Sequence, residues 1–171
     1  RLYSQILDNL NKSAVVGFDP SEIAARLKGS WMGEQAQARV YDEAQDCALR
    51  FRRYCLDHNL LDFSLQLSIF ADHLWEEPLC RDHLLETSTH LILDNVEEDT
   101  PVAHDILYAW LGAAEAGLVI YDQQAGYRSF LGADPESAAM MRDLCDETVV
   151  FERSFVVDDD EGGKLLDLDP P

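Results

Sequence analysis

The chain has 171 residues, 47% apolar and 27% charged, which is enough for one ordinary domain or two small ones with a buried core. Its 33 acidic residues against 13 basic residues give a formal net charge of -20. Phosphate neutralisation supplies much of the affinity for nucleic acid, so this balance argues against DNA binding by the chain as a whole, although it allows a local basic spot. No apolar run approaches the roughly 20 residues that span a bilayer, so no membrane association is expected.

Targeting signals and cysteines indicate the compartment. The chain opens on Arg1 and shows no signal peptide, so we expect a cytoplasmic protein and a piece of a longer parent. The cysteines lie far apart with no C-x-x-C pair, which indicates four reduced and mostly buried thiols. The five histidines show no metal-ligand spacing, and we expect structural or surface roles for them.

The first half of the chain, residues 1–86, is predicted to form a helical subdomain. Apolar residues recur at helical spacing from the N-terminus, and the first helix is expected to end near residues 11–13. Asp19 provides an N-cap before a proline, so a second helix starts there and stops at Gly29. Three further helices are predicted, namely one from residue 34 to about 57, one capped by Asp62 whose apolar run to residue 75 implies burial on most sides, and a short one opened by Pro78.

In the second half, the spacing of the apolar residues changes from the helical pattern. Residues 87–157 are predicted to be an α/β unit. Apolar runs at 90–94 and 117–122 each end in an acid and indicate buried strands, and 148–151 is predicted to be a third strand. Helices are expected between them, from residue 100 to 112 and from 135 to 145. Strands that alternate with helices favour a parallel sheet with flanking helices. Residues 158–171 are predicted to be an acidic tail or linker.

Asp94 and Asp122 follow the two predicted strands. In open parallel sheets, ligands bind beyond the carboxyl ends of the strands, where these two side chains would meet. One interpretation is that each aspartate only suits a turn. The other is a phosphate or magnesium site, because Mg²⁺ prefers carboxylate and water ligands together with substrate phosphates.

Four segments carry a resemblance to a known family. Residues 90–101, H-L-I-L-D-N-V-E-E-D-T-P, resemble the Walker B segment of superfamily-one DNA helicases of the UvrD/Rep/PcrA type, which reads apolar-apolar-V-D-E-F-Q-D-T-N-P. Residues 121–136, Y-D-Q-Q-A-G-Y-R-S-F-L-G-A-D-P-E, are similar to the family's next motif, G-D-P-D-Q-S-I-Y-x-F-R-G-A-D-P-E. Residues 151–154 resemble N-Y-R-S, and residues 61–63 resemble the upstream D-F-D-D-L-L run. The resemblance covers roughly residues 40–155 in the expected order.

The resemblance implies a helical subdomain followed by part of a RecA-like, P-loop NTPase-type parallel sheet. It implies that Asp94 is the magnesium-associated Walker B acid and that Asp122 lies beside the nucleotide. It places Arg153 against the terminal phosphate, and Tyr127 and Phe130 where the family stacks aromatic rings on single-stranded bases. ATP and magnesium are then the expected cofactors of the full-length parent, and single-stranded DNA is its expected partner.

Departures from the family pattern predict lost catalysis. Asn95 stands at the position of the catalytic glutamate, and an amide cannot act as a general base. Ala125 replaces the glutamine that senses the terminal phosphate, and Leu131 replaces an arginine. No G-x-x-x-x-G-K-[ST] loop occurs in the 171 residues, so this chain alone is expected to be no enzyme and to bind no ATP or magnesium.

Two functional hypotheses therefore stay open. In the first, the parent is a UvrD-like ATP-dependent helicase relative, and this acidic fragment binds nucleic acid weakly or not at all. In the second, it is a non-catalytic, acidic protein-interaction or scaffold module on a helicase-derived fold. A response-regulator-like acidic pocket would fit the two strand-end aspartates but does not explain residues 127–136.

Local alternatives also stay open for several residues. Residues 97–99 could form a solvated first helix turn. Tyr127 and Phe130 could be ordinary packing aromatics, and Arg153 could pair with one of the many acids on the surface.

Overall fold

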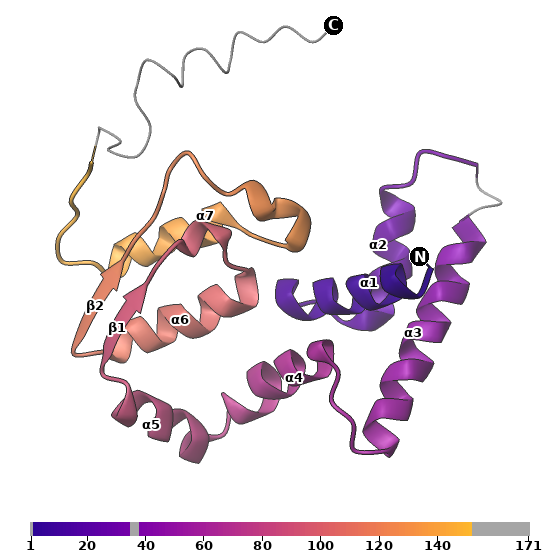
Figure 1. Cartoon of the computed structure of the whole chain (residues 1–171), viewed down its shortest axis with the longest axis horizontal. Helices are drawn as coiled ribbons and strands as arrows, with labels where there is room; N and C mark the ends of the chain where they lie inside the picture. The colour runs from indigo at the N-terminus through magenta and orange to yellow at the C-terminus, as the bar shows by residue number, and fades with distance from the viewer. Residues whose placement is uncertain (1, 35–37, 152–171) are drawn as a thin grey trace, which may run out of the picture.

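A computed structural model describes residues 2–34 and 38–151 of the chain. The first half is helical (Figure 1). Its elements are α1 (Leu2–Val16), a 3₁₀ turn (Pro20–Glu22), α2 (Ile23–Gly29), α3 (Arg39–Asp57), α4 (Phe63–Ile69), a π-helical turn (Phe70–Leu74) and α5 (Pro78–Thr87).

Local capping explains where these helices begin. The Asp19 carboxylate accepts a hydrogen bond from the backbone N–H of Ser21 at 2.7 Å, and the 3₁₀ turn leads directly into α2. The Asp62 carboxylate accepts one from the N–H of Leu65 at 3.1 Å at the start of α4. Each cap satisfies a backbone donor that the helix itself leaves unpaired, so both predicted starts are confirmed.

The first helix runs further than predicted. α1 continues to Val16 because Ser13, expected near its end, is buried and its hydroxyl donates to the carbonyl of Leu10 at 2.7 Å. The serine therefore satisfies its own polar group within the helix instead of ending it. The helix ends at Gly17, whose positive φ of 85° suits glycine.

The apolar run from residue 63 to 75 is buried only in part. Leu65 and Trp75 are buried, but Phe63 and Leu74 are exposed, so the prediction of burial on most sides is wrong. The π-helical turn at Phe70–Leu74 changes the angular step between successive side chains and interrupts a single continuous apolar face.

The second half combines helices with a two-stranded parallel sheet. Its elements are β1 (His90–Leu93), a 3₁₀ turn (Val96–Glu98), α6 (Pro101–Ala113), β2 (Ala116–Val119), a second 3₁₀ turn (Tyr127–Leu131), α7 (Pro135–Ala139) and a last 3₁₀ turn (Met140–Leu144). β1 and β2 run parallel, with His90 opposite Ala116 and Leu93 opposite Val119. The chain is thus mostly helical with a small parallel sheet, which confirms the α/β class at this coarse level.

The predicted third strand does not form. Residues 148–151 lie in no strand, and Val149, Val150 and Phe151 are all exposed. Their β-branched and aromatic side chains favour an extended chain, but a strand also needs a hydrogen-bonding neighbour, and β1 pairs only with β2 among the described residues. The prediction for this segment is therefore wrong.

Each half buries its own hydrophobic cluster. In the helical half, Leu10, Ile23 and Ala48 form the buried centre. In the other half, the buried centre is formed by Val96, Ala138 and Met141, and the side chains packed on it are Leu93, Leu107, Leu111, Val119 and Tyr121. Since these come from both strands, α6 and the α7 region, both helical segments cover the same face of the sheet.

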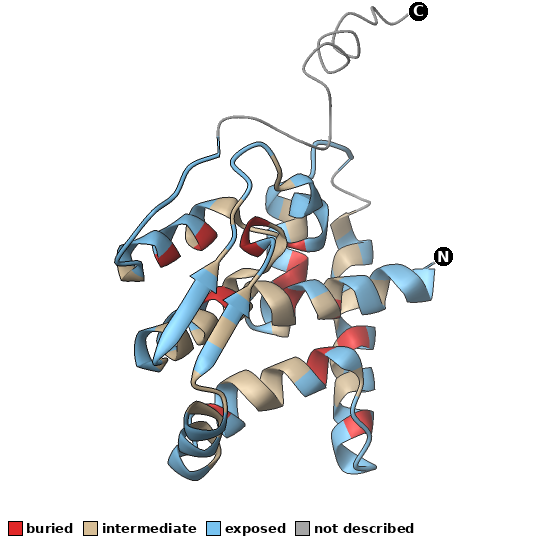
Figure 2. Ribbon diagram, turned by 60° about the vertical axis from the view of Figure 1, so that its left-hand side comes forward, coloured by how far each residue is buried: buried red, intermediate tan, exposed pale blue. Residues whose placement is uncertain are grey.

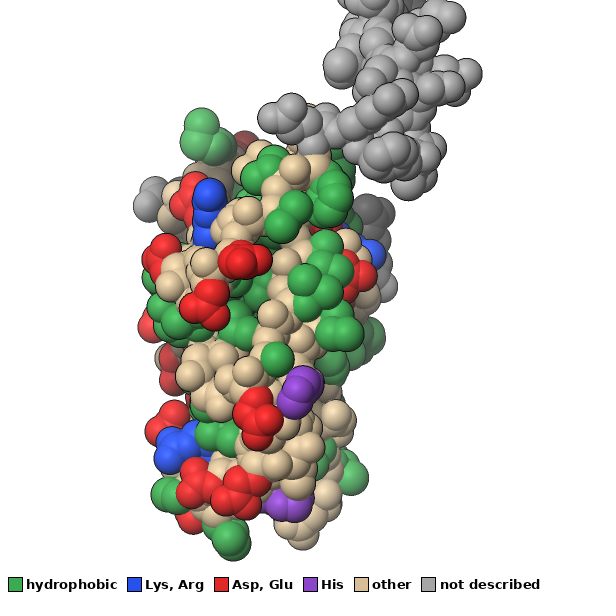
Figure 3. Space-filling model, turned by 90° about the vertical axis from the view of Figure 1, so that its left-hand side faces the viewer, with side chains coloured by type: hydrophobic (Ala, Val, Ile, Leu, Met, Phe, Trp, Pro, Cys, Tyr) green, Lys and Arg blue, Asp and Glu red, His purple; other side chains and the backbone are tan. Residues whose placement is uncertain are grey.

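The opposite face of the sheet is open. Ile92 on β1 and Leu118 on β2 lie opposite each other and are 74% and 53% exposed. Figure 2 shows both strands in front, with no described helix over them. Figure 3 views this side of the molecule and shows hydrophobic side chains gathered beside acidic ones.

The two halves meet where α1 ends. A Cβ on Gly17 would lie 3.0 Å from a methyl group of Val102 on α6. A Cβ on Gly132, which has φ of 104°, would lie 3.2 Å from methyl groups of both Val15 and Val16. Glycine at these positions permits both the backbone turn and the close approach of α1 to the second half.

The cysteines correct one further expectation. All four are free thiols, as expected, but only Cys55 is buried, whereas Cys47 and Cys145 are exposed. Burial, together with the charge of Asp62, raises the pKa of the Cys55 thiol. No helix within the described residues is both long and apolar enough to cross a membrane.

Candidate functional site at the carboxyl edge of the sheet

The chain segments that leave β1 and β2 stay side by side. The N–H of Ile120 donates to the carbonyl of Leu93 at 2.8 Å, and the N–H of Val96 donates back to the carbonyl of Ile120 at 3.3 Å. Asn95 lies between these bonds in the left-handed conformation, with φ of 55° and ψ of 43°. Asparagine tolerates this conformation better than most residues, so it can turn the chain sharply at the edge.

Glu97 fills the space beneath this turn. Its side chain is only 1% exposed, and its carboxylate accepts a hydrogen bond from the backbone N–H of Asp122 at 3.2 Å. Burying a carboxylate without hydrogen-bond donors costs free energy, and the bond from Asp122 reduces that cost. The alternative that residues 97–99 form a solvated turn is therefore wrong for Glu97.

Glu98 binds the backbone of the loop that follows β2. Its carboxylate accepts hydrogen bonds from the N–H groups of Gly126, Tyr127 and Arg128 at 3.0, 3.1 and 3.1 Å. Gly126 has φ of 92°, a conformation that aims successive N–H groups at one point. Hydrogen bonds to an ionised acceptor are stronger than those between neutral groups, so the start of the 3₁₀ turn is firmly held.

The held turn presents two aromatic side chains to solvent. Tyr127 is 79% exposed and Phe130 is 71% exposed, so neither is a packing aromatic. Two basic residues lie in the same region. Arg128 has its guanidinium 3.7 Å from the Glu98 carboxylate, and the Lys12 ammonium donates to the carbonyl of Phe130 at 3.4 Å.

The structure brings most of the predicted site residues to one edge. Asp94 and Asn95 follow β1 and are exposed, and Asp122 follows the extension of β2. The Asp122 carboxylate accepts from the N–H of Gln124 at 2.8 Å, which is the turn-forming contact expected of a strand-end aspartate. Arg153 lies outside the described residues. Within the described ranges, no group of three or more His, Cys, Asp or Glu side chains could hold a metal ion.

A buried histidine supports the same edge. His104 on α6 donates from Nε2 to the carbonyl of Val96 at 2.8 Å, and its Nδ1 lies in hydrogen-bond contact with the hydroxyl of Ser137. This is the structural role expected of the histidines. Beside it, partial burial raises the pKa of the Asp99 carboxyl, and the charges of His104 and Arg128 oppose that shift.

Sequence reasoning did not assign the anchoring roles of Glu97, Glu98 and His104. Motif comparison drew attention to residues that match a reaction, whereas these three act through hydrogen bonds with residues 8 to 33 positions away. The available signal was weak. It consisted of two consecutive glutamates directly after Val96, the single apolar residue of the connection between the predicted strand and helix.

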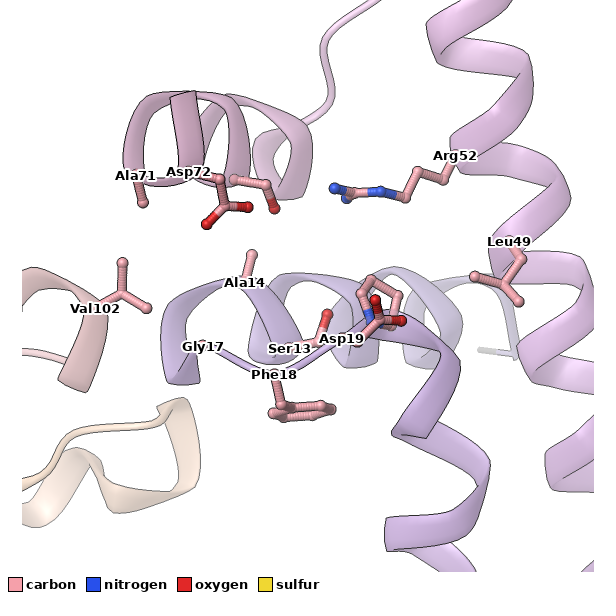
Figure 4. A pocket seen from close by; sticks show the side chains of 12 residues that line it. Ser13, Ala14, Gly17, Phe18, Asp19, Leu49, Arg52, Ala71, Asp72 and Val102 are labelled. Carbon is pink, nitrogen blue, oxygen red and sulfur yellow. The ribbon is translucent and has the colours of Figure 1, made fainter. Parts of the chain in front are cut away.

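A cavity of about 440 Å³ lies elsewhere, between α1, α3, the π-helical turn and α6. Arg52 extends from α3 into it, with Asp72 on another wall and Asp19 below (Figure 4). The guanidinium donates to the Ser64 hydroxyl at 3.3 Å, and hydrogen bonds from Ser21, together with the Arg52 charge, lower the pKa of Asp19. None of the predicted site residues that the structure describes lines this cavity.

Comparison with known proteins gave no match: no family model, no curated protein and no solved structure is significantly similar to this chain.

Proposed function

We propose that the chain is part of a UvrD-like DNA helicase relative, built on a RecA-like P-loop NTPase fold in which the capacity for hydrolysis has degenerated. The observation that carries this proposal is the loop at the sheet edge. Glu98 binds three of its backbone N–H groups, while Tyr127 and Phe130 remain largely exposed. Exposed aromatic rings on a firmly held loop are suited to stacking on the bases of single-stranded nucleic acid.

The chemistry of the edge supports binding without turnover. Asp94 is exposed beside Asn95, so its carboxylate is available to a magnesium ion and its neighbour is an amide. An amide cannot take a proton from the attacking water, which removes a contribution of about 10²–10⁴ to the rate. In the full-length protein, ATP and Mg²⁺ would lie at this edge near Asp94 and Asp122, on a phosphate-binding loop that these 171 residues lack.

The nucleic-acid partner is restricted by charge. A net charge of -20 repels a phosphate backbone, whereas Lys12 and Arg128 offer cations next to the aromatic pair. We therefore expect short single-stranded DNA as the partner, with weak affinity for this chain alone.

The experiment is magnesium-dependent ATP binding and turnover by the full-length protein, with and without single-stranded DNA. We expect ATP binding with little turnover, and a gain in turnover for Asn95→Glu, because a carboxylate restores the general base. Turnover stimulated by DNA and abolished in Asp94→Ala would contradict the degenerate assignment but keep the helicase one. Absence of both ATP and DNA binding would overturn the proposal.

A second candidate function, an acidic protein-interaction module, is favoured by the open sheet face. Parallel sheets are normally covered on both faces, yet Ile92 and Leu118 are exposed on this one. The net charge points to a partner surface with an apolar centre and basic residues around it. Ile92→Ser combined with Leu118→Ser should then abolish partner binding and leave single-stranded DNA binding unchanged, whereas the helicase proposal predicts no such separation.

A further inference from the structure

Three consecutive residues contact the loop after β2 at its start, middle and end. Glu97 accepts from the N–H of Asp122, Glu98 accepts from three N–H groups at residues 126–128, and the carbonyl of Asp99 accepts from the N–H of Asp134 at 3.0 Å. These contacts span residues 122–134, the whole segment that carries Tyr127 and Phe130.

The 3₁₀ turn Val96–Glu98, which carries two of these acids, is itself held in place by the core of the second half. Val96 is fully buried in the second core, and its carbonyl accepts from the buried His104. Glu97 is buried beside it, so the 3₁₀ turn cannot move without disrupting the core. The loop is thus attached to one of the best-packed parts of the molecule, although the loop itself lies in solvent.

We propose that Glu97, Glu98 and Asp99 form a positioning clamp that holds Tyr127 and Phe130 ready for single-stranded bases, with Glu98 as its principal residue. Glu98 is the principal residue because its side chain supplies all three central bonds, whereas Asp99 acts through its backbone. The role in base stacking rests on the proposed function, but the clamp itself does not require it.

The test compares Glu98→Ala, Glu98→Gln and the control Glu115→Gln in the full-length protein. Glu115 is exposed and follows α6, so its variant removes the same charge away from the loop. The first readout is residue-resolved hydrogen exchange. Glu98→Ala should speed exchange about tenfold or more at residues 126–128, because each amide loses a charge-assisted acceptor.

Glu98→Gln sharpens the result. In the native protein, Oε1 accepts from Gly126 and Tyr127, while Oε2 accepts from Arg128. A glutamine oxygen can keep the first two bonds, whereas its NH₂ group would face the third donor. Exchange should therefore rise mainly at Arg128. A merely structural role would instead raise exchange throughout the domain, including the core amide of Met141.

The second readout is binding of oligothymidylate of about 16 nucleotides, the upper end of a single-strand site. Affinity should fall about tenfold in Glu98→Ala and stay unchanged in Glu115→Gln. Unchanged exchange in Glu98→Ala would overturn the clamp even if DNA binding persisted. Altered exchange in a native protein that binds no oligothymidylate would leave the clamp standing and overturn the stacking function.

Discussion

The two halves of the molecule bury polar groups in different ways. Among the described residues of the helical half, the buried polar ones are Ser13 and Ser64, and each hydroxyl donates to an acceptor within three positions of the chain, although Ser64 also accepts from Arg52 on α3. In the α/β half, the buried polar residues are Glu97 and His104, whose partners lie 25 and 8 to 33 positions away. Local bonds stabilise single helices, whereas long-range bonds fix loops relative to a core.

This difference separates the helical half from the half that carries the candidate site. Buried polar groups with distant partners cost desolvation and are retained only where several chain segments supply bonds to them. In this protein they gather under the edge that carries Asp94, Asn95 and the aromatic loop. The candidate site therefore lies over the α/β core.

The largest expected effect comes from cavities in the two cores. Leu10→Ala and Met141→Ala each remove a fully buried side chain, one from each half. Each should lower the free energy of unfolding by about 2–5 kcal/mol. Urea unfolding followed by circular dichroism measures the effect.

The double variant sharpens the comparison. Leu10 and Met141 belong to separate clusters, so the two losses should add to within about 0.5 kcal/mol. A non-additivity well above that value would show that the two cores are energetically coupled.

The next largest effect separates long-range from local polar bonds. His104→Leu leaves the carbonyl of Val96 buried without its donor and should cost about 1–3 kcal/mol. Ser13→Ala removes a hydroxyl whose partner carbonyl already belongs to α1, so about 0.5 kcal/mol or less is expected. Equal losses in the two variants, measured by urea unfolding, would contradict the distinction between the halves.

The smallest effects concern pH and have opposite signs. In the helical half, the pKa of Asp19 is lowered, so its contribution to stability is present above the unfolded pKa and is lost as pH falls through the folded pKa. In the other half, the pKa of Asp99 is raised, so its ionised form destabilises the fold at neutral pH, and this penalty disappears as the carboxyl protonates.

Replacing each aspartate by asparagine tests the two opposite effects on stability. Asp19→Asn should destabilise the protein at neutral pH and have no effect in acid. Asp99→Asn should stabilise it at neutral pH, with a benefit that shrinks as pH falls. Thermal unfolding from about pH 7 down to about pH 3 measures both, and shifts of equal sign would show that the environments of the two carboxyls are alike.

Features encoded by nearest neighbours could be read from the sequence. Asp19 and Asp62 were expected to cap helices and do, since a cap needs only a side chain and an N–H two or three positions later. The meeting of Asp94 and Asp122 at one edge was also predictable, because parallel strands place their carboxyl ends together. In contrast, the extension of α1 through Ser13 depended on burial, which local sequence does not report.

The remaining features depended on distant partners. Residues 148–151 have the composition of a strand but no neighbour to pair with among the described residues. Composition alone therefore predicted a strand that does not form. Glu97 and Glu98 looked like solvated acids because their donors lie more than 20 positions away. By itself, the sequence determined helix starts, the parallel strand pair and the edge where polar residues gather, because periodicity and capping act within a few residues. Only the tertiary structure decided which acids are buried and how the aromatic loop is held, because those outcomes depend on backbone donors from segments far apart in the chain.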